Sequence, residues 1–406
     1  MTRHRLAAGL SLLVLAAPLG AQQRTDRADV PAWETFIREL DTFAARDSIV
    51  GYGAVLVRDG RILRRHSHGM ADRDRGQPAG DSTLYHWASI TKTLTAVAIM
   101  QLRDRGLLSL DDRITKWIPD LRQVHAAEGA MDDITIRMLL SHSSGLQDPT
   151  WPWDRGRDWE PFEPTRWEQL VAMMPYQELR FRPGSRYGYS NPAFIYLARV
   201  IEAVTGDPYQ SYVHKNIWAP LGMARSYFGA TPWHLAAYRS NNYSLERDSA
   251  GREFTAAGGR DFDPGITIPN GGWNAPLDDV ARWAAFLVGA DGVGPAVNGP
   301  YGGVLSRRSL DEMWRPVVPL SASSADSMGL SFFVYGRTGR RLVGHTGDQA
   351  NFRSFMLLDP HTRTALISVV NTSNTVRGRE SDAGLDALLR TGLRLLAAPT
   401  AAGRRK

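Results

Sequence analysis

The sequence predicts an α/β protein of the α+β type, in which an antiparallel β-sheet is flanked by helices and carries an inserted, mostly helical lobe. Three observations lead to this prediction. Strand patterns occur near both ends of the 406-residue chain, helical periods fill its middle, and Gly and Asp-Pro turns separate the strands of the last third. Strands from the two ends can share one sheet if the helical part is an insertion between them.

The first elements are a helix and a hairpin. Apolar residues at helical spacing predict a helix over residues 33–45. Residues 52–57 are apolar and β-prone, Arg58-Asp59-Gly60 has the composition of a turn, and residues 61–66 return as a second strand.

The middle of the chain is predicted to be helical. A long helix begins near Ser89, and Gly106 is a suitable stop signal. A short helix over 134–140 ends at Ser141-His142-Ser143-Ser144-Gly145, where we interpret His142 as a structural residue. Further helices are predicted over residues 167–174, 191–205, 209–217 and 278–287.

The last third predicts an antiparallel meander followed by a helix. The strands are expected over residues 330–335, 341–345, 351–358 and 364–370, and an amphipathic helix over 385–397. These elements predict a discontinuous sheet domain of residues 22–84 and 327–398 and a mostly helical domain of residues 85–326. Residues 399–406 form a basic tail.

Two other features have simple interpretations. His66 and His68 alternate on one strand face, but no carboxylate or third histidine follows at metal-binding spacing. We therefore expect a solvated strand face and no metal site. Residues 147–164 have no period and are crowded with tryptophan and proline, which predicts an ordered loop. This loop either packs locally or forms a pocket wall.

The N-terminus has the pattern of a secretory signal peptide over residues 1–21. Basic residues at 3–5 are followed by an apolar run to Leu19 and by small residues before Gln22. The run is short for a membrane span, and no later segment reaches about 18 uncharged apolar residues. We expect an exported protein, periplasmic or secreted, with no integral membrane segment after cleavage.

The composition argues against several kinds of site and binding partner. The chain has no cysteine, so disulfides and thiolate metal ligands are excluded. The net charge is +6, part of it lies in the basic tail, and no basic stripe with interleaved aromatic residues occurs. Nucleic acid is therefore not an expected partner. The oligomeric state is left open.

The most informative motif is Ser89-Ile90-Thr91-Lys92. The chain carries 44 arginines and four lysines, so a lysine at an ordinary cationic position is unusual. A desolvated lysine can lose its proton and act as a base, whereas arginine stays charged. A serine three residues earlier on a helix lies on the same face, so we interpret Ser89 as a nucleophile and Lys92 as its base. The alternative is a surface serine and lysine on an ordinary helix.

Two further motifs follow along the chain. Tyr189-Ser190-Asn191 lies at a turn before a predicted helix, and His345-Thr346-Gly347 ends a predicted strand. Taken singly, Tyr189 could belong to an aromatic cluster and His345 could be a half-buried strand histidine. The order and separation of the three motifs along the chain indicate that they act together in one functional site.

With this order the chain resembles the serine β-lactamase and penicillin-binding protein superfamily, whose signature is Ser-x-x-Lys, then Ser-Asp-Asn, then Lys-Thr-Gly. The Tyr-x-Asn form of the middle motif is similar to the class C branch, which includes esterases and D,D-peptidases. The resemblance runs from about residue 53 to residue 371. Further segments that look like landmarks of this branch are residues 139–146, 220–223 and 276–279.

The resemblance implies a β-lactamase/transpeptidase-like fold and a serine hydrolase that works through an acyl-enzyme without metal or cofactor. Ser89 would attack a carbonyl, and Lys92 and Tyr189 would share proton transfer, with the principal base left open. The substrate-binding and oxyanion residues implied by the resemblance are Asn191, His345, Thr346, Gly347 and Asp348, the last through its backbone N–H together with that of Ser89.

Two residues depart from the family pattern. His345 replaces a lysine, and a neutral imidazole lacks the fixed charge that would recognise a substrate carboxylate. Asp348 stands where small residues are common, and its carboxylate would oppose an oxyanion unless it points to solvent.

The substrate is expected to be a small molecule or a cell-wall peptide. Esters, D-amino-acid peptides or amides, and β-lactams all fit the motifs, and esters are favoured because His345 replaces the cation that would recognise a β-lactam carboxylate. No Gly-x-Ser-x-Gly elbow occurs, which disfavours an α/β-hydrolase. The competing hypothesis is a catalytically slow penicillin- or cell-wall-peptide-binding protein.

Overall fold

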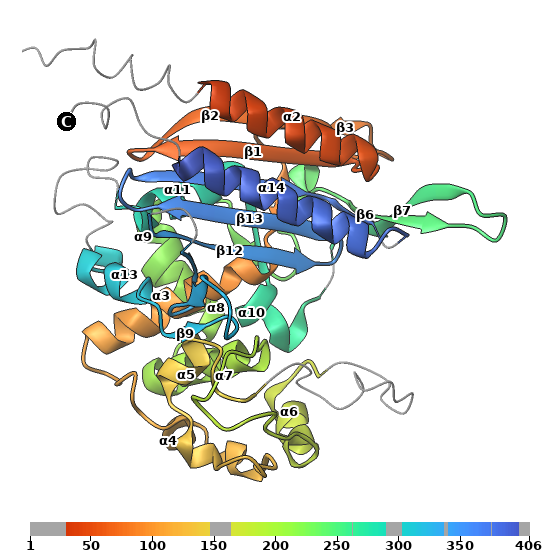
Figure 1. Cartoon of the computed structure of the whole chain (residues 1–406). Helices are drawn as coiled ribbons and strands as arrows, with labels where there is room; N and C mark the ends of the chain where they lie inside the picture. The colour runs from red at the N-terminus through yellow and green to blue at the C-terminus, as the bar shows by residue number, and fades with distance from the viewer. Residues whose placement is uncertain are drawn as a thin grey trace, which may run out of the picture.

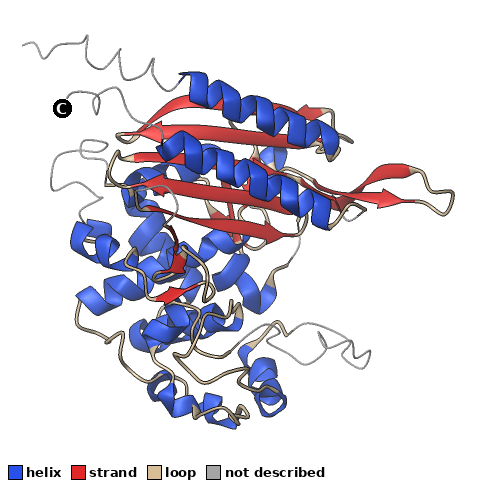
Figure 2. Ribbon diagram, viewed as in Figure 1, coloured by secondary structure: helices blue, strands red, loops and turns tan. Residues whose placement is uncertain are grey.

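The computed structural model of the chain describes residues 30–146, 164–261, 263–289, 303–336, 340–374 and 376–397. It confirms the α+β prediction, with a large antiparallel sheet, two helices on one face and a helical lobe on the other (Figures 1 and 2). The predicted signal peptide, nearly all of the tryptophan-rich loop and the basic tail lie outside the described residues. The domain boundaries given above stay a prediction.

Both ends of the chain contribute to the main sheet. Its nine strands follow the order β3-β2-β1-β14-β13-β12-β11-β10-β9, and each neighbouring pair is antiparallel. The strands are β1 (Gly51–Arg58), β2 (Arg61–Asp72), β3 (Gln77–Pro78), β9 (Val318–Pro319), β10 (Ser327–Met328), β11 (Phe333–Tyr335), β12 (Leu342–Gln349), β13 (Phe352–Asp359) and β14 (Thr364–Val370). The join runs from Tyr52 opposite Val370 to Arg58 opposite Thr364.

Two helices cover one face of this sheet. They are α2 (Val30–Arg46) and α14 (Arg379–Ala397), which lie side by side across the strands (Figure 1). Phe36 and Leu40, one helical turn apart on α2, are fully buried in the same apolar cluster as Leu366 of β14. This spacing is the one that predicted the first helix, and it explains why the helix packs where it does.

The other face carries the helical lobe. Its helices are α3 (Thr91–Asp104), α4 (Ile114–Trp117), α5 (Ile136–Leu140), α6 (Trp167–Met173), α7 (Pro192–Thr205), α8 (Tyr209–Val213), α9 (Ala219–Leu221), α10 (Ile268–Gly271), α11 (Leu277–Leu287) and α13 (Arg307–Met313). Every residue of α3 from Thr91 to Leu102 is buried. Its threonine hydroxyls are satisfied locally: Thr93 donates to the Ile90 carbonyl at 2.7 Å and accepts from the Trp283 indole at 3.0 Å. A polar helix face can therefore lie in the core.

Several short strands were not expected. They are β4 (Leu84–His86), β5 (Tyr227–Phe228), β6 (Asn242–Arg247), β7 (Glu253–Gly259), β8 (Trp273–Pro276) and β15 (Thr372–Asn374). Strands β4 and β8 are buried throughout, so they show no alternation of apolar and polar residues. Strands β6 and β7 form a hairpin that extends from the body of the molecule (Figure 1).

Three other expectations need correction. The helix predicted over 209–217 ends at Val213 and continues as a π-helical turn over His214–Trp218. The His345 motif lies inside β12, which runs four residues beyond His345. His66 is not simply solvated, because its Nε2 lies 3.0 Å from Asp41 Oδ1 on α2. Among the described helices, none is long and apolar enough to cross a membrane.

Candidate active site

The Ser89 segment forms a strained turn that exposes one hydroxyl. A 3₁₀ turn, η1 (Ala88–Ile90), leads into α3, and Ala88 has a φ of +48°, which is rare for a residue with a Cβ. Such strain persists where the surrounding structure holds it in place, and it is frequent at functional sites. Within residues 83–102, Ser89 alone is partly accessible and the others are buried. The turn therefore presents the serine at the edge of a buried helix.

Lys92 points at that serine from within the core. Its Nζ lies 2.9 Å from Ser89 Oγ and donates to the Asn270 carbonyl on α10 at 2.7 Å. The Lys92 side chain is fully buried. The prediction that the two residues share a helix face is confirmed, and the alternative of a surface pair is wrong. Desolvation is the condition under which a lysine can serve as a base.

Tyr189, three residues before α7, lies beside the same lysine amine. The Lys92 Nζ lies 5.0 Å from the centre of the Tyr189 ring. The His142 ring stacks on Tyr189, with 4.4 Å between ring centres and 20° between planes. His142 Nδ1 accepts the Ser190 N–H at 2.9 Å, and the His142 carbonyl accepts the Gly188 N–H at 2.8 Å.

His142 therefore has a specific structural role, which is to hold the turn that carries Tyr189. It contacts the Tyr189 turn through a ring face, a ring nitrogen and a backbone carbonyl. Burial, reinforced by the nearby Lys92, lowers the pKa of His142 well below its usual value. A neutral ring keeps the Nδ1 lone pair available for the Ser190 N–H.

We expect His142→Phe to lower both stability and turnover. Phenylalanine keeps the stacked ring but leaves the buried Ser190 N–H without its acceptor, which costs about 1–3 kcal/mol of unfolding free energy. A displaced Tyr189 should lower kcat by roughly 10-fold or more. Urea unfolding and ester hydrolysis measure the two effects.

The matched control for that variant is His125→Phe. His125 is exposed, so its replacement should change the unfolding free energy by less than about 0.5 kcal/mol. A His142→Phe enzyme with wild-type kcat would show that His142 does not orient Tyr189.

The third motif lies on the open edge of β12. Strand β11 pairs with β12 only as far as Gly344, so among the described residues those that follow have no strand partner on that side. His345 is fully buried, 6.4 Å from the Tyr189 ring between ring centres, and its Nδ1 donates to the Thr346 carbonyl at 2.6 Å. Burial, reinforced by the charge of Lys92, lowers the pKa of His345 to about 3. The ring is therefore neutral at physiological pH.

Gly347 and Asp348 place the backbone of β12 against the Ser89 turn. A Cβ at Gly347 would overlap the Trp87 carbonyl oxygen and lie 3.3 Å from the Ala88 Cβ, so only glycine permits this approach. The exposed carboxylate of Asp348 lies 3.2 Å from Arg353 Nε, and Arg353 also donates to Asp382 of α14 at 2.6 Å. The Asp348 carboxylate thus lies on the α14 face of the sheet, away from Ser89, and does not oppose an oxyanion there.

The sequence was also compared with models of known protein families, and the result agrees with this geometry. The model of the Beta-lactamase family matches residues 36–391. The chain belongs to the Beta-lactamase family. Esterase EstB of Burkholderia gladioli is 34% identical over 258 residues, which cover 58% of this chain and 64% of that protein. The chain therefore spans under two thirds of the length of this relative.

Two solved structures share the fold of this chain. D-amino acid amidase from Ochrobactrum anthropi superposes with a TM-score of 0.71 and 21% identity, over 91% of this chain and all of that one. A class C β-lactamase superposes with a TM-score of 0.69 and 15% identity, over 91% of this chain and 97% of that one. The resemblance drawn from the three motifs is confirmed.

The structure brings Ser89, Lys92, Tyr189 and His345 together, and it sets Gly347 beside the Ser89 turn. The remaining predicted residues, Asn191 and Thr346, are partly exposed. The Asn270 carbonyl, which accepts Lys92 Nζ, was not among the predicted site residues. A backbone acceptor has no side-chain signature, so no pattern could have indicated it.

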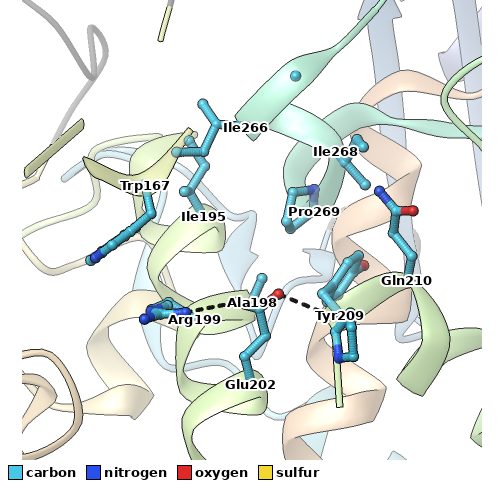
Figure 3. A pocket seen from close by; sticks show the side chains of 12 residues that line it. Trp167, Ile195, Ala198, Arg199, Glu202, Tyr209, Gln210, Ile266, Ile268 and Pro269 are labelled. Atoms are coloured by element: carbon cyan, nitrogen blue, oxygen red, sulfur yellow. Dashed lines mark hydrogen bonds and ion pairs between the residues drawn. The ribbon is translucent and has the colours of Figure 1, made fainter. Parts of the chain in front are cut away.

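A cavity of about 350 Å³ is lined by residues of α7, α8 and α10 (Figure 3). Its wall includes Ile268 and Pro269 of α10, Ile195 and Glu202 of α7, and Tyr209 of α8. The lining includes none of the predicted site residues, so the cavity is separate from the Ser89 site.

Proposed function

We propose that this chain is a serine hydrolase that acts through an acyl-enzyme, with esters as favoured substrates and D-amino-acid peptides or amides and β-lactams as related ones. One observation carries the proposal: the buried Lys92 amine lies 2.9 Å from the hydroxyl of the partly accessible Ser89. A serine becomes a strong nucleophile when a positioned base accepts its proton.

The first half of the reaction forms the acyl-enzyme. Ser89 Oγ attacks the substrate carbonyl carbon as its proton passes to Lys92, and the carbonyl oxygen becomes an oxyanion. The N–H groups of Ser89 and Asp348 donate to that oxyanion. Collapse of the tetrahedral intermediate breaks the bond to the alcohol or amine, which leaves with a proton relayed through Lys92 and Tyr189. In the second half, water attacks the acyl carbon and gives a proton to the same groups. The bond between the acyl carbon and Ser89 Oγ then breaks, Oγ regains the proton, and the acid is released.

The substrate preference rests on His345. In the Lys-Thr-Gly form of the motif a permanent cation occupies this place, whereas His345 is neutral because burial lowers its pKa to about 3. A carboxylate-bearing β-lactam would find no fixed positive charge there. Esterase EstB, the relative with 34% identity, is named for ester hydrolysis. Both observations favour esters.

We expect kcat/KM for a short-chain p-nitrophenyl ester to exceed kcat/KM for a chromogenic cephalosporin. His345→Lys should shift the ratio toward the cephalosporin, because an ammonium can pair with its carboxylate. A ratio below one for the unmodified chain would contradict the ester preference. An unchanged ratio in the variant would show that position 345 does not act on the substrate.

Trapping experiments separate the hydrolase from the competing hypothesis of a slow penicillin- or cell-wall-peptide-binding protein. A fluorophosphonate should label Ser89 stoichiometrically, and an ester substrate should turn over many times per labelled site. A burst of one acyl group per chain without further turnover would instead indicate a binding protein whose deacylation is blocked.

We also propose that the protein is exported to the periplasm or beyond the cell. The basic start, apolar run and small residues of positions 1–21 support this proposal. N-terminal sequencing of the protein recovered from the periplasm or medium tests it, and a full-length cytoplasmic product would contradict it.

A further inference from the structure

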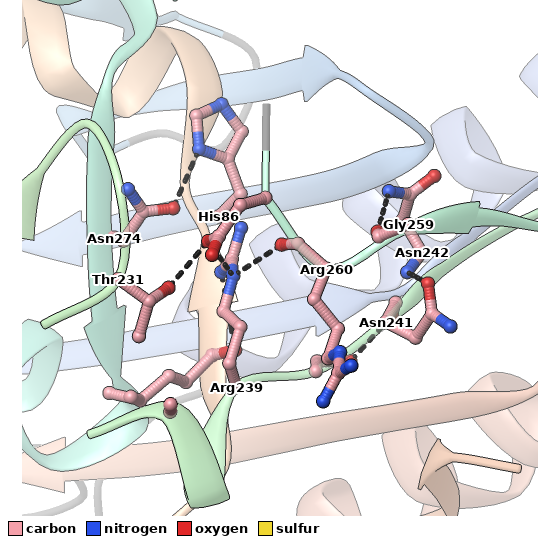
Figure 4. Close-up of polar contacts among 12 residues, drawn as sticks. His86, Thr231, Arg239, Asn241, Asn242, Gly259, Arg260 and Asn274 are labelled. Atoms are coloured by element: carbon pink, nitrogen blue, oxygen red, sulfur yellow. Dashed lines mark hydrogen bonds and ion pairs between the residues drawn. The ribbon is translucent and has the colours of Figure 1, made fainter. Parts of the chain in front are cut away.

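Two polar side chains outside the assigned site connect the segments that bear the proposed oxyanion donors. His86 is the last residue of β4, three positions before Ser89, and Gln349 is the last residue of β12, one position after Asp348. His86 Nε2 lies 3.2 Å from Gln349 Oε1. His86 Nδ1 lies 3.0 Å from Asn274 Oδ1 on β8 (Figure 4).

The environment of His86 fixes the direction of these hydrogen bonds. The ring is buried, and burial together with the charge of Arg239 lowers the pKa of His86 to about 4, so it carries one N–H at neutral pH. Asn274 donates its Nδ2 to the Gly272 carbonyl at 3.2 Å, so its Oδ1 faces the ring and accepts Nδ1–H. Nε2 then holds a lone pair, and the Gln349 amide, whose two orientations have the same shape, presents its NH₂ to it.

Gln349 also packs against α10. A Cβ at Gly271 would overlap the same terminal atom of the Gln349 amide that faces His86, so the amide packs directly on this glycine. The preceding residue, Asn270, supplies the carbonyl that accepts Lys92 Nζ at 2.7 Å. The pair His86 and Gln349 therefore lies between the Ser89 segment, the end of β12 and the turn that holds Lys92.

We infer that His86 and Gln349 are positioning residues that hold the backbone N–H groups of Ser89 and Asp348 at the separation an oxyanion requires. This inference rests on the proposed function. The two donors belong to different chain segments, and the β12 ladder aligns Asp348 with β13 rather than with the Ser89 turn. Gly347 packs against the Trp87 carbonyl, and a side-chain hydrogen bond between the two segments adds a directional constraint, because oxyanion donors act only within about 2.7–3.1 Å of the oxygen.

Gln349→Met is the direct test, because methionine keeps the length of the side chain and removes its hydrogen bonds. We expect kcat for a p-nitrophenyl ester to fall about 10- to 100-fold, with KM changed less than about 3-fold, since the donors act in the transition state and not in ground-state binding. The affinity for phenylboronic acid, which forms a tetrahedral adduct with a serine, should fall by the same factor as kcat.

The matched control is Asn351→Gly. Asn351 lies two residues beyond Gln349, and its Nδ2 donates to Asn242 Oδ1 on β6 at 2.8 Å, so it makes the same kind of bond to a segment away from the site. Its φ of +62° suits glycine. We expect wild-type kcat and boronate affinity in this variant. An equal loss in Asn351→Gly would show that any weakened bond near the β12 turn has the same effect.

A second variant, His86→Phe, closes a double-mutant cycle. If the two side chains act as a unit, the double variant should lose little more kcat than Gln349→Met alone. If His86→Phe does not fold, Gln349→Met decides the question.

The outcomes separate this inference from the proposed function. Suppose that the wild type hydrolyses the ester and takes the fluorophosphonate label, and that Gln349→Met has wild-type kcat and boronate affinity. This result overturns the inference and leaves the proposed function intact. A wild type that does neither overturns the proposed function, and the inference with it. A Gln349→Met loss that appears in KM and not in kcat or boronate affinity assigns the pair to substrate binding and also overturns the inference.

Discussion

Replacing Ser89 with alanine is expected to abolish turnover and to leave the fold intact. The hydroxyl is the only group removed, and it is the proposed source of the new covalent bond. Loss of the nucleophile in a serine hydrolase lowers kcat on the order of 10⁴- to 10⁶-fold. Because Ser89 is partly accessible and alanine fits the same turn, the melting temperature should change little.

Ser82→Ala is the control for this variant. Ser82 lies seven residues earlier and is exposed, so its replacement should leave kcat/KM unchanged. The measurement is the rate of p-nitrophenyl ester hydrolysis together with fluorophosphonate labelling of both variants. Retention of more than a few per cent of the activity by Ser89→Ala, or labelling of that variant, would place the nucleophile elsewhere.

Lys92→Arg is expected to be nearly as damaging as Lys92→Ala. Arginine keeps the positive charge and much of the volume, but its guanidinium cannot take a proton from Ser89. Loss of a general base lowers the rate on the order of 10²- to 10⁴-fold. The buried site also holds Lys92 between Ser89 Oγ at 2.9 Å and the Asn270 carbonyl at 2.7 Å, a geometry that a longer, planar group cannot reproduce.

The chain offers two matched controls for the same exchange. Lys116 and Lys215 are exposed and pair with Asp112 at 2.9 Å and Asp207 at 2.7 Å. Their replacement by arginine should preserve both pairs and leave kcat/KM unchanged, since exposed ion pairs contribute only about 0–1 kcal/mol. If Lys92→Arg were as active as these controls, Lys92 would supply a fixed charge and not a base.

The sequence alone determined the features that depend on local spacing. The heptad-like spacing of Phe36, Leu40 and Phe43 predicted the first helix, and the turn at Arg58-Asp59-Gly60 predicted the first hairpin. The serine and lysine three residues apart predicted a shared helix face, and the 2.9 Å distance between their side chains agrees with it. Such inferences succeed because backbone geometry fixes which neighbours along the chain meet.

Tertiary structure decided what depends on residues far apart in the chain. Burial lowers the pKa of His345, so its side chain is neutral. The Asp348 carboxylate pairs with Arg353 on the face of the sheet that is opposite to Ser89. The Asn270 carbonyl, which lies 178 residues after Lys92 in the sequence, accepts the second hydrogen bond of the Lys92 amine. Spacing along a sequence carries no information about such encounters, because they arise only when separate elements pack against one another. The three motifs therefore indicated which groups belong to the site, and the packing of β12 and α10 against the Ser89 turn determined their charge and orientation.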